Sequence, residues 1–148
     1  MARRRTTDQR TRALAMPLEL PGATLTHPFG DDVNVYKVGI ATATDVGTGR
    51  HAGGKLFAMI GLWGDPGIVT LKVEPEVGPT LIAEHPAIEP GYHMNKRHWI
   101  SVTLDGSVPD DVLRELVEDS YDLVVSTLTA RQRFDVDPDR FPLPRRTR

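Results

Sequence analysis

The densest group of side chains that could bind or catalyse lies in one ten-residue stretch, GYHMNKRHWI at positions 91–100. The stretch holds two aromatic rings, two imidazoles, an amide and the cations of Lys96 and Arg97. Cations beside an aromatic ring suit an anionic ligand or bases that stack on the ring. The alternative is structural, because an amphipathic indole such as that of Trp99 often covers the edge of a core. The spacing alone leaves both interpretations open.

The residues after this stretch predict the element that positions it. ISVTL at 100–104 alternates apolar and polar residues, as a half-buried strand does. The side chains should fall on two sides of this strand, with Ile100, Val102 and Leu104 toward the core and Trp99, Ser101 and Thr103 away from it. A large indole beside cations is therefore expected on the wetter face of a sheet.

Similar alternation, together with turn-forming residues, predicts the rest of the fold. Strands are expected at 33–38, 55–62, 68–73 and 99–104. The connections among the first three are too short for crossover helices, so these strands should be antiparallel. Helices are expected at 7–16, 75–84 and 108–128, the last of them capped by Ser107. This order predicts an α+β domain with a single antiparallel β-sheet and helices packed on one face.

The face of the sheet away from the helices is a candidate platform for nucleic acid, because aromatic and cationic side chains would gather there. Its expected residues are Thr70, Lys72, Trp99, Ser101 and Thr103, joined by either Tyr36 or Lys37 from the first strand. Which of those two points outward depends on a register that the sequence leaves open. The same residues also describe an ordinary solvated sheet face.

Composition excludes several classes of protein. The 148 residues suffice for one domain with a full core, expected at 1–130. An extended Arg- and Pro-rich tail, either lying on the body or disordered, is expected at 131–148. The absence of cysteine excludes disulfide scaffolds, thiolate zinc sites and cysteine nucleophiles. No apolar run reaches the roughly 18 residues of a membrane span. The basic N-terminal end at 1–6 lacks the apolar segment of a secretory signal, so a cytoplasmic bacterial protein is expected.

Charge is unevenly distributed along the chain. The net charge is −2, but residues 1–12 carry +4 and residues 131–148 carry +3, which leaves −9 on the body between them. Basic ends can touch phosphate, and ordinary solubilising termini have the same composition. The acidic body argues against a domain that coats duplex DNA by charge alone.

Signals for catalysis are weak, and a non-enzymatic protein without cofactor or metal is predicted. None of the serines lies in a nucleophile-elbow pattern. His93 and His98 are five residues apart, a spacing that suits a metal pair on neither a helix nor a strand. His27, beside Asp31 and Asp32, is interpreted as a hydrogen-bonded turn histidine, because no further ligands follow at a suitable spacing.

The chain also resembles the MmcQ/YjbR family over roughly residues 8–130. The resemblance is carried, in order, by LPGAT at 20–24, HPFGDDV at 27–33, GKLFA at 54–58, LK at 71–72, GYHMNKRHW at 91–99, LDG at 104–106 and SYDLV at 120–124. The block at 91–99 is the most specific of these. Two features depart from the family pattern: an insertion expected at about 40–53 in a hairpin, and the long tail beyond 131.

The resemblance implies a compact α+β fold of the YjbR/CyaY-like kind, also described as frataxin-like or double-wing. It also implies a DNA-binding role, by analogy of fold with a phage transcription-factor domain, although a fold does not by itself define a function. The residues carried over as a surface motif are Lys72, His93, Asn95, Lys96, His98 and Trp99, to which the residue pattern adds Arg97. No catalytic role is carried over.

Two functional hypotheses remain. In the first, the chain is a non-catalytic, regulatory module that takes single- or double-stranded DNA on the sheet face or on the 91–99 loop. In the second, it binds a small anion, another small molecule or a protein, which the acidic body favours. A third and weaker hypothesis, by analogy with frataxin, places a metal on the acidic face of the last helix, formed by Asp110, Asp111, Glu115, Glu118 and Asp119.

Overall fold

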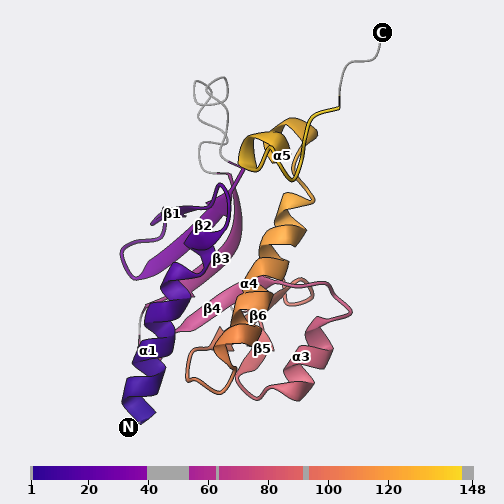
Figure 1. The fold of residues 1–148 in the computed structure, drawn as a ribbon. Coiled ribbons are helices and arrows are strands. Elements are labelled where there is room, and N and C mark those ends of the chain that lie inside the picture. Colours follow the sequence, from indigo (N-terminus) through magenta and orange to yellow (C-terminus); the bar gives the residue numbers. More distant parts are fainter. Residues whose placement is uncertain (1, 40–53, 63, 92–93, 145–148) are drawn as a thin grey trace.

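The fold is one antiparallel sheet with helices packed against it (Figure 1). The computed structural model describes residues 2–39, 54–62, 64–91 and 94–144, so the insertion predicted at about 40–53 lies outside its description. Six strands lie in the order β1-β2-β3-β4-β6-β5, and every neighbouring pair is antiparallel. The predicted α+β class is confirmed, with β6 inserted between β4 and β5.

All four predicted strands are present, with ends that agree to within one residue. They are β2 (Val33–Val38), β3 (Lys55–Gly61), β4 (Ile68–Lys72) and β6 (Trp99–Thr103). Two further strands, β1 (Thr24–Thr26) and β5 (Ile88–Pro90), form the edges of the sheet. The sequence did not reveal them because three residues are too few for an alternation to show. Such short edges also leave little backbone free to pair with another chain.

A helix occurs in each predicted region, but the ends differ from the prediction: α1 (Ala2–Ala15), α3 (Gly78–Glu84) and α4 (Asp110–Val125). The short 3-10 helix η1 (Pro17–Glu19) and α5 (Ala130–Val136) were not predicted. The first helix starts five residues before the predicted position. Across the described ranges, none of the helices combines the length and the apolar character that crossing a membrane requires.

The predicted cap of α4 is wrong. The backbone N and the Oγ of Ser107 both donate to Asp105 Oδ1, at 2.9 and 2.6 Å. Both bonds hold Ser107 in a local turn of the loop that precedes the helix. The helix instead begins at Asp110, with Pro109 as its N-cap residue. Asp110 and Asp111 then occupy the first turn, where the helix dipole favours negative charge.

The predicted extended tail is also wrong in its first part, where α5 forms. A capping box starts this helix: Gln132 N donates to Thr129 Oγ1 at 3.1 Å, and Thr129 N donates to Gln132 Oε1 at 2.9 Å. Further along, Phe141 packs against the core, and the Arg140 guanidinium lies 4.8 Å from the centroid of its ring. Arg140 also pairs with Asp122 of α4. The first part of the tail therefore folds against the rest of the chain.

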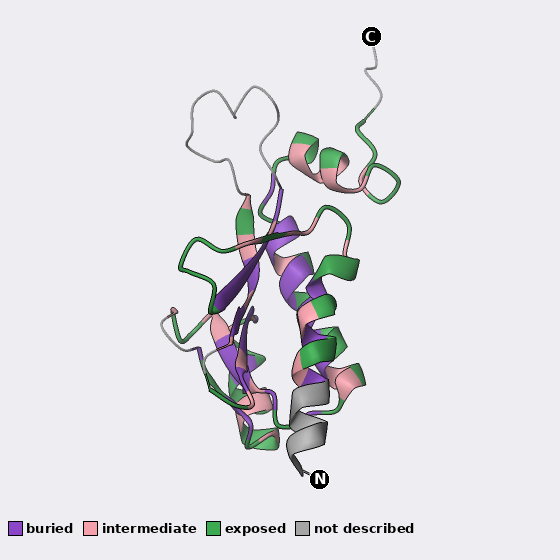
Figure 2. Cartoon of the chain, turned by 90° about the vertical axis from the view of Figure 1, so that its left-hand side faces the viewer, coloured by how far each residue is buried: buried purple, intermediate pink, exposed green. Residues whose placement is uncertain are grey.

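The register of the strands decides which side chains meet the helices. Val69 stands opposite Val102 and Leu71 opposite Ile100, and directly opposed residues share a face of the sheet. Each of the four is at most 1 % exposed. Figure 2 shows α1 and α4 together on one side of the sheet, with buried segments between the layers. The predicted inward face of β4 and β6 is therefore confirmed.

Tyr36, and not Lys37, points toward the helices. Tyr36 stands opposite Ala58 and is fully buried, and its Oη donates to Leu14 O of α1 at 2.7 Å. The amide of Asn34 donates to the same Oη at 3.3 Å. Burial raises the pKa of Tyr36 above its ordinary value. Lys37 consequently belongs to the face of the sheet away from α1 and α4.

A buried serine fixes α4 to the sheet beside a β-bulge. The pairing of β2 with β3 shifts register after Tyr36, which leaves Phe57 as the extra residue. The Phe57 carbonyl accepts a hydrogen bond from Ser120 Oγ, and the same Oγ accepts one from Lys72 N at 2.8 Å. Ser120 therefore joins one helix to two strands through a single hydroxyl.

Tyr121 adds an aromatic contact at the same place. Its ring meets Phe57 edge-on, with the ring centroids 5.4 Å apart, and its Oη donates to Pro21 O at 2.5 Å. Burial raises the pKa of Tyr121 to about 12, and the nearby carboxylate of Asp137 adds to the rise.

The protein should consequently lose stability at alkaline pH. Above pH 10 the unfolded chain gives up the phenolic proton of Tyr121, while the folded chain keeps it until about pH 12, so rising pH shifts the equilibrium toward unfolding. We expect urea unfolding of Tyr121→Phe to depend less on pH in this window than unfolding of the wild type. The folded wild type should gain phenolate absorbance from Tyr121 near pH 12, and Tyr121→Phe should lack this gain. Ionisation of Tyr121 near pH 10 in the folded protein would contradict this prediction.

Candidate functional site

The stretch at 91–100 connects β5 to β6, and its first residue is held against its ninth. Gly91 N donates to Trp99 O at 2.8 Å. A Cβ added to Gly91 would lie 2.6 Å from the Cβ of Trp99, so a residue with a side chain does not fit without displacing the backbone. The glycine at the start of the motif therefore has a packing role, and it positions Trp99.

Asn95 shapes the turn that precedes β6. Its Oδ1 accepts a hydrogen bond from Arg97 N at 3.0 Å, and its backbone carbonyl accepts one from His98 N at 3.1 Å. Asn side chains favour turns because they bond to the backbone two residues on. The turn leaves the side chains of Lys96 and Arg97 exposed. Asn95 thus holds the backbone from which the two cations project.

Lys72 lies on β4, directly opposite Trp99 at the start of β6. Val73 N donates to His98 O at 2.8 Å, which continues the contact between the two strands by one residue. Because opposed residues share a face, Lys72 and Trp99 lie together on the side of the sheet away from α1 and α4. Both are half-buried, and Lys37 of β2 belongs to the same face.

The middle of this face does not offer hydroxyl groups to a ligand. Thr70 and Ser101 stand opposite each other with Oγ1 and Oγ 3.0 Å apart, and they are only 3 % and 5 % exposed. Both residues lie on the predicted face, but they are not available as part of a binding platform, because they are buried and their hydroxyls bond to each other across the strands. The half-buried polar and aromatic residues of this face include Lys37, Lys72, Trp99 and Thr103.

Lys96 and Arg97 border a hollow of about 460 Å³, here called the basic hollow. Trp99 does not line it, because the alternation of β6 places Trp99 and Ile100 on opposite faces. The candidate site therefore has two sides, one aromatic and one apolar, with cations beside each. The other residues of the basic hollow are Pro75, Gly78, Pro79, Ile82, Ala83, Pro90 and Ile100.

The apolar lining of the basic hollow was not anticipated from the sequence. It comes from α3, from β5 and from β6, which are brought together only by the tertiary fold. The available signal was the apolar character of the short helix, whose Ile82 lines this hollow.

The structure brings together some of the predicted site residues. Four lie at one end of the sheet: Lys72 and Trp99 pair on the face away from α1 and α4, and Lys96 and Arg97 are exposed in the turn before β6. Asn95 serves the turn, and His98 is half-buried in the same turn. His93 lies outside the described residues. That these residues bind a ligand stays a prediction.

The other candidate sites have local structural explanations. In the part of the chain that the structure describes, no three His, Asp or Glu side chains come together as metal ligands would. Asp110 pairs with Arg12, and the hydrogen bond from that guanidinium lowers the pKa of Asp110. His27 is confirmed as a hydrogen-bonded turn histidine, with Nε2 2.9 Å from Asn34 Oδ1.

Similar proteins are known from several bacteria. The family model YjbR matches residues 18–123. YbdF of Escherichia coli O157:H7 is 37% identical over 127 residues, which cover 85% of this chain and 92% of that protein. YjbR of Escherichia coli K12 is 40% identical over 78 residues, which cover 53% of this chain and 66% of that protein. Both relatives are described as uncharacterized.

Solved structures show the same fold. The crystal structure of Deinococcus radiodurans protein DR2400 is 36% identical and superposes with a TM-score of 0.69, covering 88% of this chain and 85% of that one. A crystal structure of a Pseudomonas syringae protein is 27% identical with a TM-score of 0.56, covering 78% of this chain and 97% of that one. These two structures therefore share the architecture of this chain.

Proposed function

This protein belongs to the YjbR family, and we propose that it is a non-catalytic module that binds nucleic acid at the end of the sheet around Trp99. The observation that carries the proposal is the pairing of Lys72 with Trp99 on the face away from α1 and α4. An aromatic ring next to a cation can stack on a base while the cation meets the adjoining phosphate. The double-wing resemblance supports the same class of ligand as an analogy of fold.

The turn before β6 supplies the remaining charge. Lys96 and Arg97 are exposed within three residues of Trp99, and the bonds of Asn95 hold the turn that carries them. The middle of the face is closed by Thr70 and Ser101, so contact is limited to this end. A short single strand of nucleic acid that crosses this end of the sheet fits the surface better than a duplex laid along the sheet.

The proposal predicts that stacking and charge contribute separately. Trp99→Ala should weaken binding of a twelve-nucleotide single strand about tenfold, since stacking on one aromatic ring contributes roughly 1–3 kcal/mol. Exchanging both Lys96 and Arg97 for glutamine should instead flatten the dependence of affinity on salt, by roughly 0.7 units of logarithmic slope for each charge on a single strand. Fluorescence anisotropy of a labelled oligonucleotide at low and moderate salt measures both effects.

Two controls separate binding from folding. Arg114→Gln removes one positive charge from α4, where Arg114 pairs with Glu19, and it should leave both the oligonucleotide affinity and its salt dependence unchanged. Urea unfolding of Trp99→Ala should show a loss below that of a fully buried aromatic, which is about 3–5 kcal/mol. A stability loss of about 3–5 kcal/mol in Trp99→Ala with unchanged affinity for the oligonucleotide would mean that Trp99 covers the edge of the core and does not bind the ligand. Binding weaker than about 100 μM at low salt, where non-specific contacts should already appear, would refute the nucleic-acid proposal.

The basic hollow favours a second candidate function, the binding of a small anion with an apolar body. Its cations, Lys96 and Arg97, stand over walls that include Ile82 and Ile100. A ligand pocket commonly combines such apolar walls with a few polar groups that orient the ligand. Saturable binding of octanoate, lost when Lys96 and Arg97 are exchanged, would favour this candidate if the oligonucleotide does not bind.

A further inference from the structure

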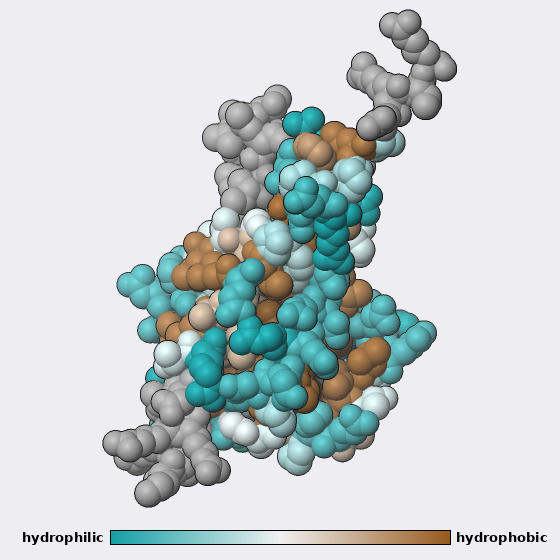
Figure 3. All heavy atoms as spheres, in the orientation of Figure 1, coloured by the Kyte–Doolittle hydropathy of each residue, from teal (hydrophilic) through white to brown (hydrophobic). Residues whose placement is uncertain are grey.

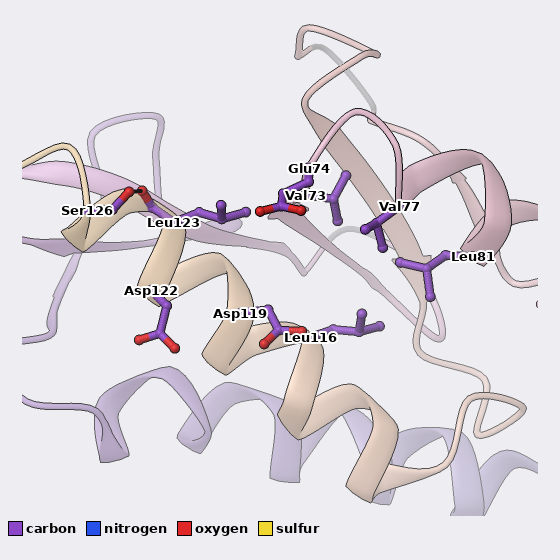
Figure 4. A pocket seen from close by; sticks show the side chains of 9 residues that line it. All are labelled: Val73, Glu74, Val77, Leu81, Leu116, Asp119, Asp122, Leu123 and Ser126. Carbon is purple, nitrogen blue, oxygen red and sulfur yellow. Dashed lines mark hydrogen bonds between the residues drawn. The ribbon is translucent and has the colours of Figure 1, made fainter.

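A second hollow of about 460 Å³ lies on the other side of α3, where α3 faces α4 (Figure 4). Its walls are apolar, formed by Val73, Val77, Leu81, Leu116 and Leu123. The surface view shows hydrophobic residues reaching the surface beside α3, as they also do near β1 and α5 (Figure 3). This hollow is here called the acidic hollow, because its charged lining residues are all carboxylates.

Three carboxylates line the acidic hollow, those of Glu74, Asp119 and Asp122. Glu74 and Asp119 line it from the segment after β4 and from α4, and Figure 4 shows both beside the gap between α3 and α4. Among the described residues, neither has an ion-pair partner. Asp122, the third carboxylate, already pairs with Arg140 at 2.9 Å. Two carboxylates therefore remain available beside an apolar surface.

We propose that the acidic hollow binds a small organic cation, a protonated amine carried on an aliphatic body. The volume is within the range of roughly 300–1,000 Å³ that holds small ligands. The aliphatic body would be removed from water against Leu81, Leu116 and Leu123, while the ammonium meets Glu74 and Asp119. A neutral ligand would leave both carboxylates without a partner, and an anion would be repelled by them. The acidic hollow is separate from the end of the sheet around Trp99, and this proposal does not depend on the proposed function.

Hexylammonium and hexanol test the proposal, because they share one aliphatic chain and differ in charge. Titration followed by ¹H–¹⁵N NMR should shift the backbone amides of Val77, Leu81 and Leu123, and hexylammonium should bind at least fivefold more tightly than hexanol. Each of Glu74→Gln and Asp119→Asn should reduce this preference about twofold to fivefold, as expected for partly solvated ion pairs. The two exchanges together should abolish the preference.

Glu118→Gln provides the matched control, since Glu118 is an exposed carboxylate on α4 that does not line the acidic hollow. This variant should keep the full preference for hexylammonium. Equal affinities of wild type for the two probes, an equal loss in Glu118→Gln, or shifts confined to residues outside the hollow would each overturn the proposal. Failure of both probes to bind at 10 mM, roughly the weakest affinity that such a titration detects, would overturn it as well.

Discussion

Ser120→Ala is expected to lower the free energy of unfolding by about 2–4 kcal/mol. The hydroxyl of Ser120 is fully buried, donates to Phe57 O and accepts from Lys72 N. Alanine fills nearly the same space, so the loss comes from two backbone groups left without a partner in the interior. Urea denaturation followed by circular dichroism measures the change.

A second serine in the same helix region serves as the control. Ser126 is exposed and its Oγ donates to Leu123 O one turn earlier, so Ser126→Ala should change stability by less than about 0.5 kcal/mol. Ser120→Cys should fall between the two alanine variants, because a thiol has a similar size but forms weak hydrogen bonds. If Ser120→Ala were as stable as Ser126→Ala, the bridge between α4 and the sheet would have no energetic importance.

Gln9→Ala is expected to lower the free energy of unfolding by about 3 kcal/mol. Gln9 lies in α1, is 1 % exposed, and its amide nitrogen donates to Val108 O at 2.7 Å and to Asp110 Oδ1 at 3.1 Å. Its amide oxygen accepts from Gly106 N at 2.8 Å. One side chain thus holds α1 to the loop that leads into α4, and its removal leaves the carbonyl of the buried Val108 without this partner. Thermal and urea unfolding should both show the loss.

Gln9→Glu separates hydrogen bonding from packing. A glutamate keeps the size of the side chain but places a carboxylate next to Asp110, in a site with almost no access to water. Burial and the neighbouring charge would raise the pKa of that carboxyl above its unfolded value of about 4.3. The variant should therefore lose stability relative to wild type as pH rises from 4 to 7. A difference from wild type that does not change with pH would contradict the buried position of this side chain.

Local patterns in the sequence determined the strands and their inward faces. The alternation at β2, β3, β4 and β6 records burial on one side, since side chains in a strand point alternately to opposite faces. That is why Val102 and Leu104 were assigned correctly without coordinates. The motif blocks were sufficient to identify the family. The turn-forming residues around His27 were sufficient to predict that its imidazole forms a hydrogen bond in a turn.

Tertiary structure decided the choices between local alternatives. The sequence pattern did not determine whether Tyr36 or Lys37 points toward the helices. The register with β3 and the hydrogen bond to Leu14 O place Tyr36 on that face. Ser107 had the correct residue type for a helix cap, but it lies in a local turn with Asp105, and the helix begins only at Asp110. Strands as short as β1 and β5 exist only because a neighbouring strand pairs with them.

The candidate site shows the same division. The sequence by itself determined that Lys96, Arg97 and Trp99 would lie together, because they are adjacent in one turn and strand. Only the tertiary structure placed Lys72 beside Trp99 and put the two hollows on either side of α3. Those arrangements depend on residues that are distant along the chain, and a sequence pattern reports the burial of a residue but not the identity of its partner.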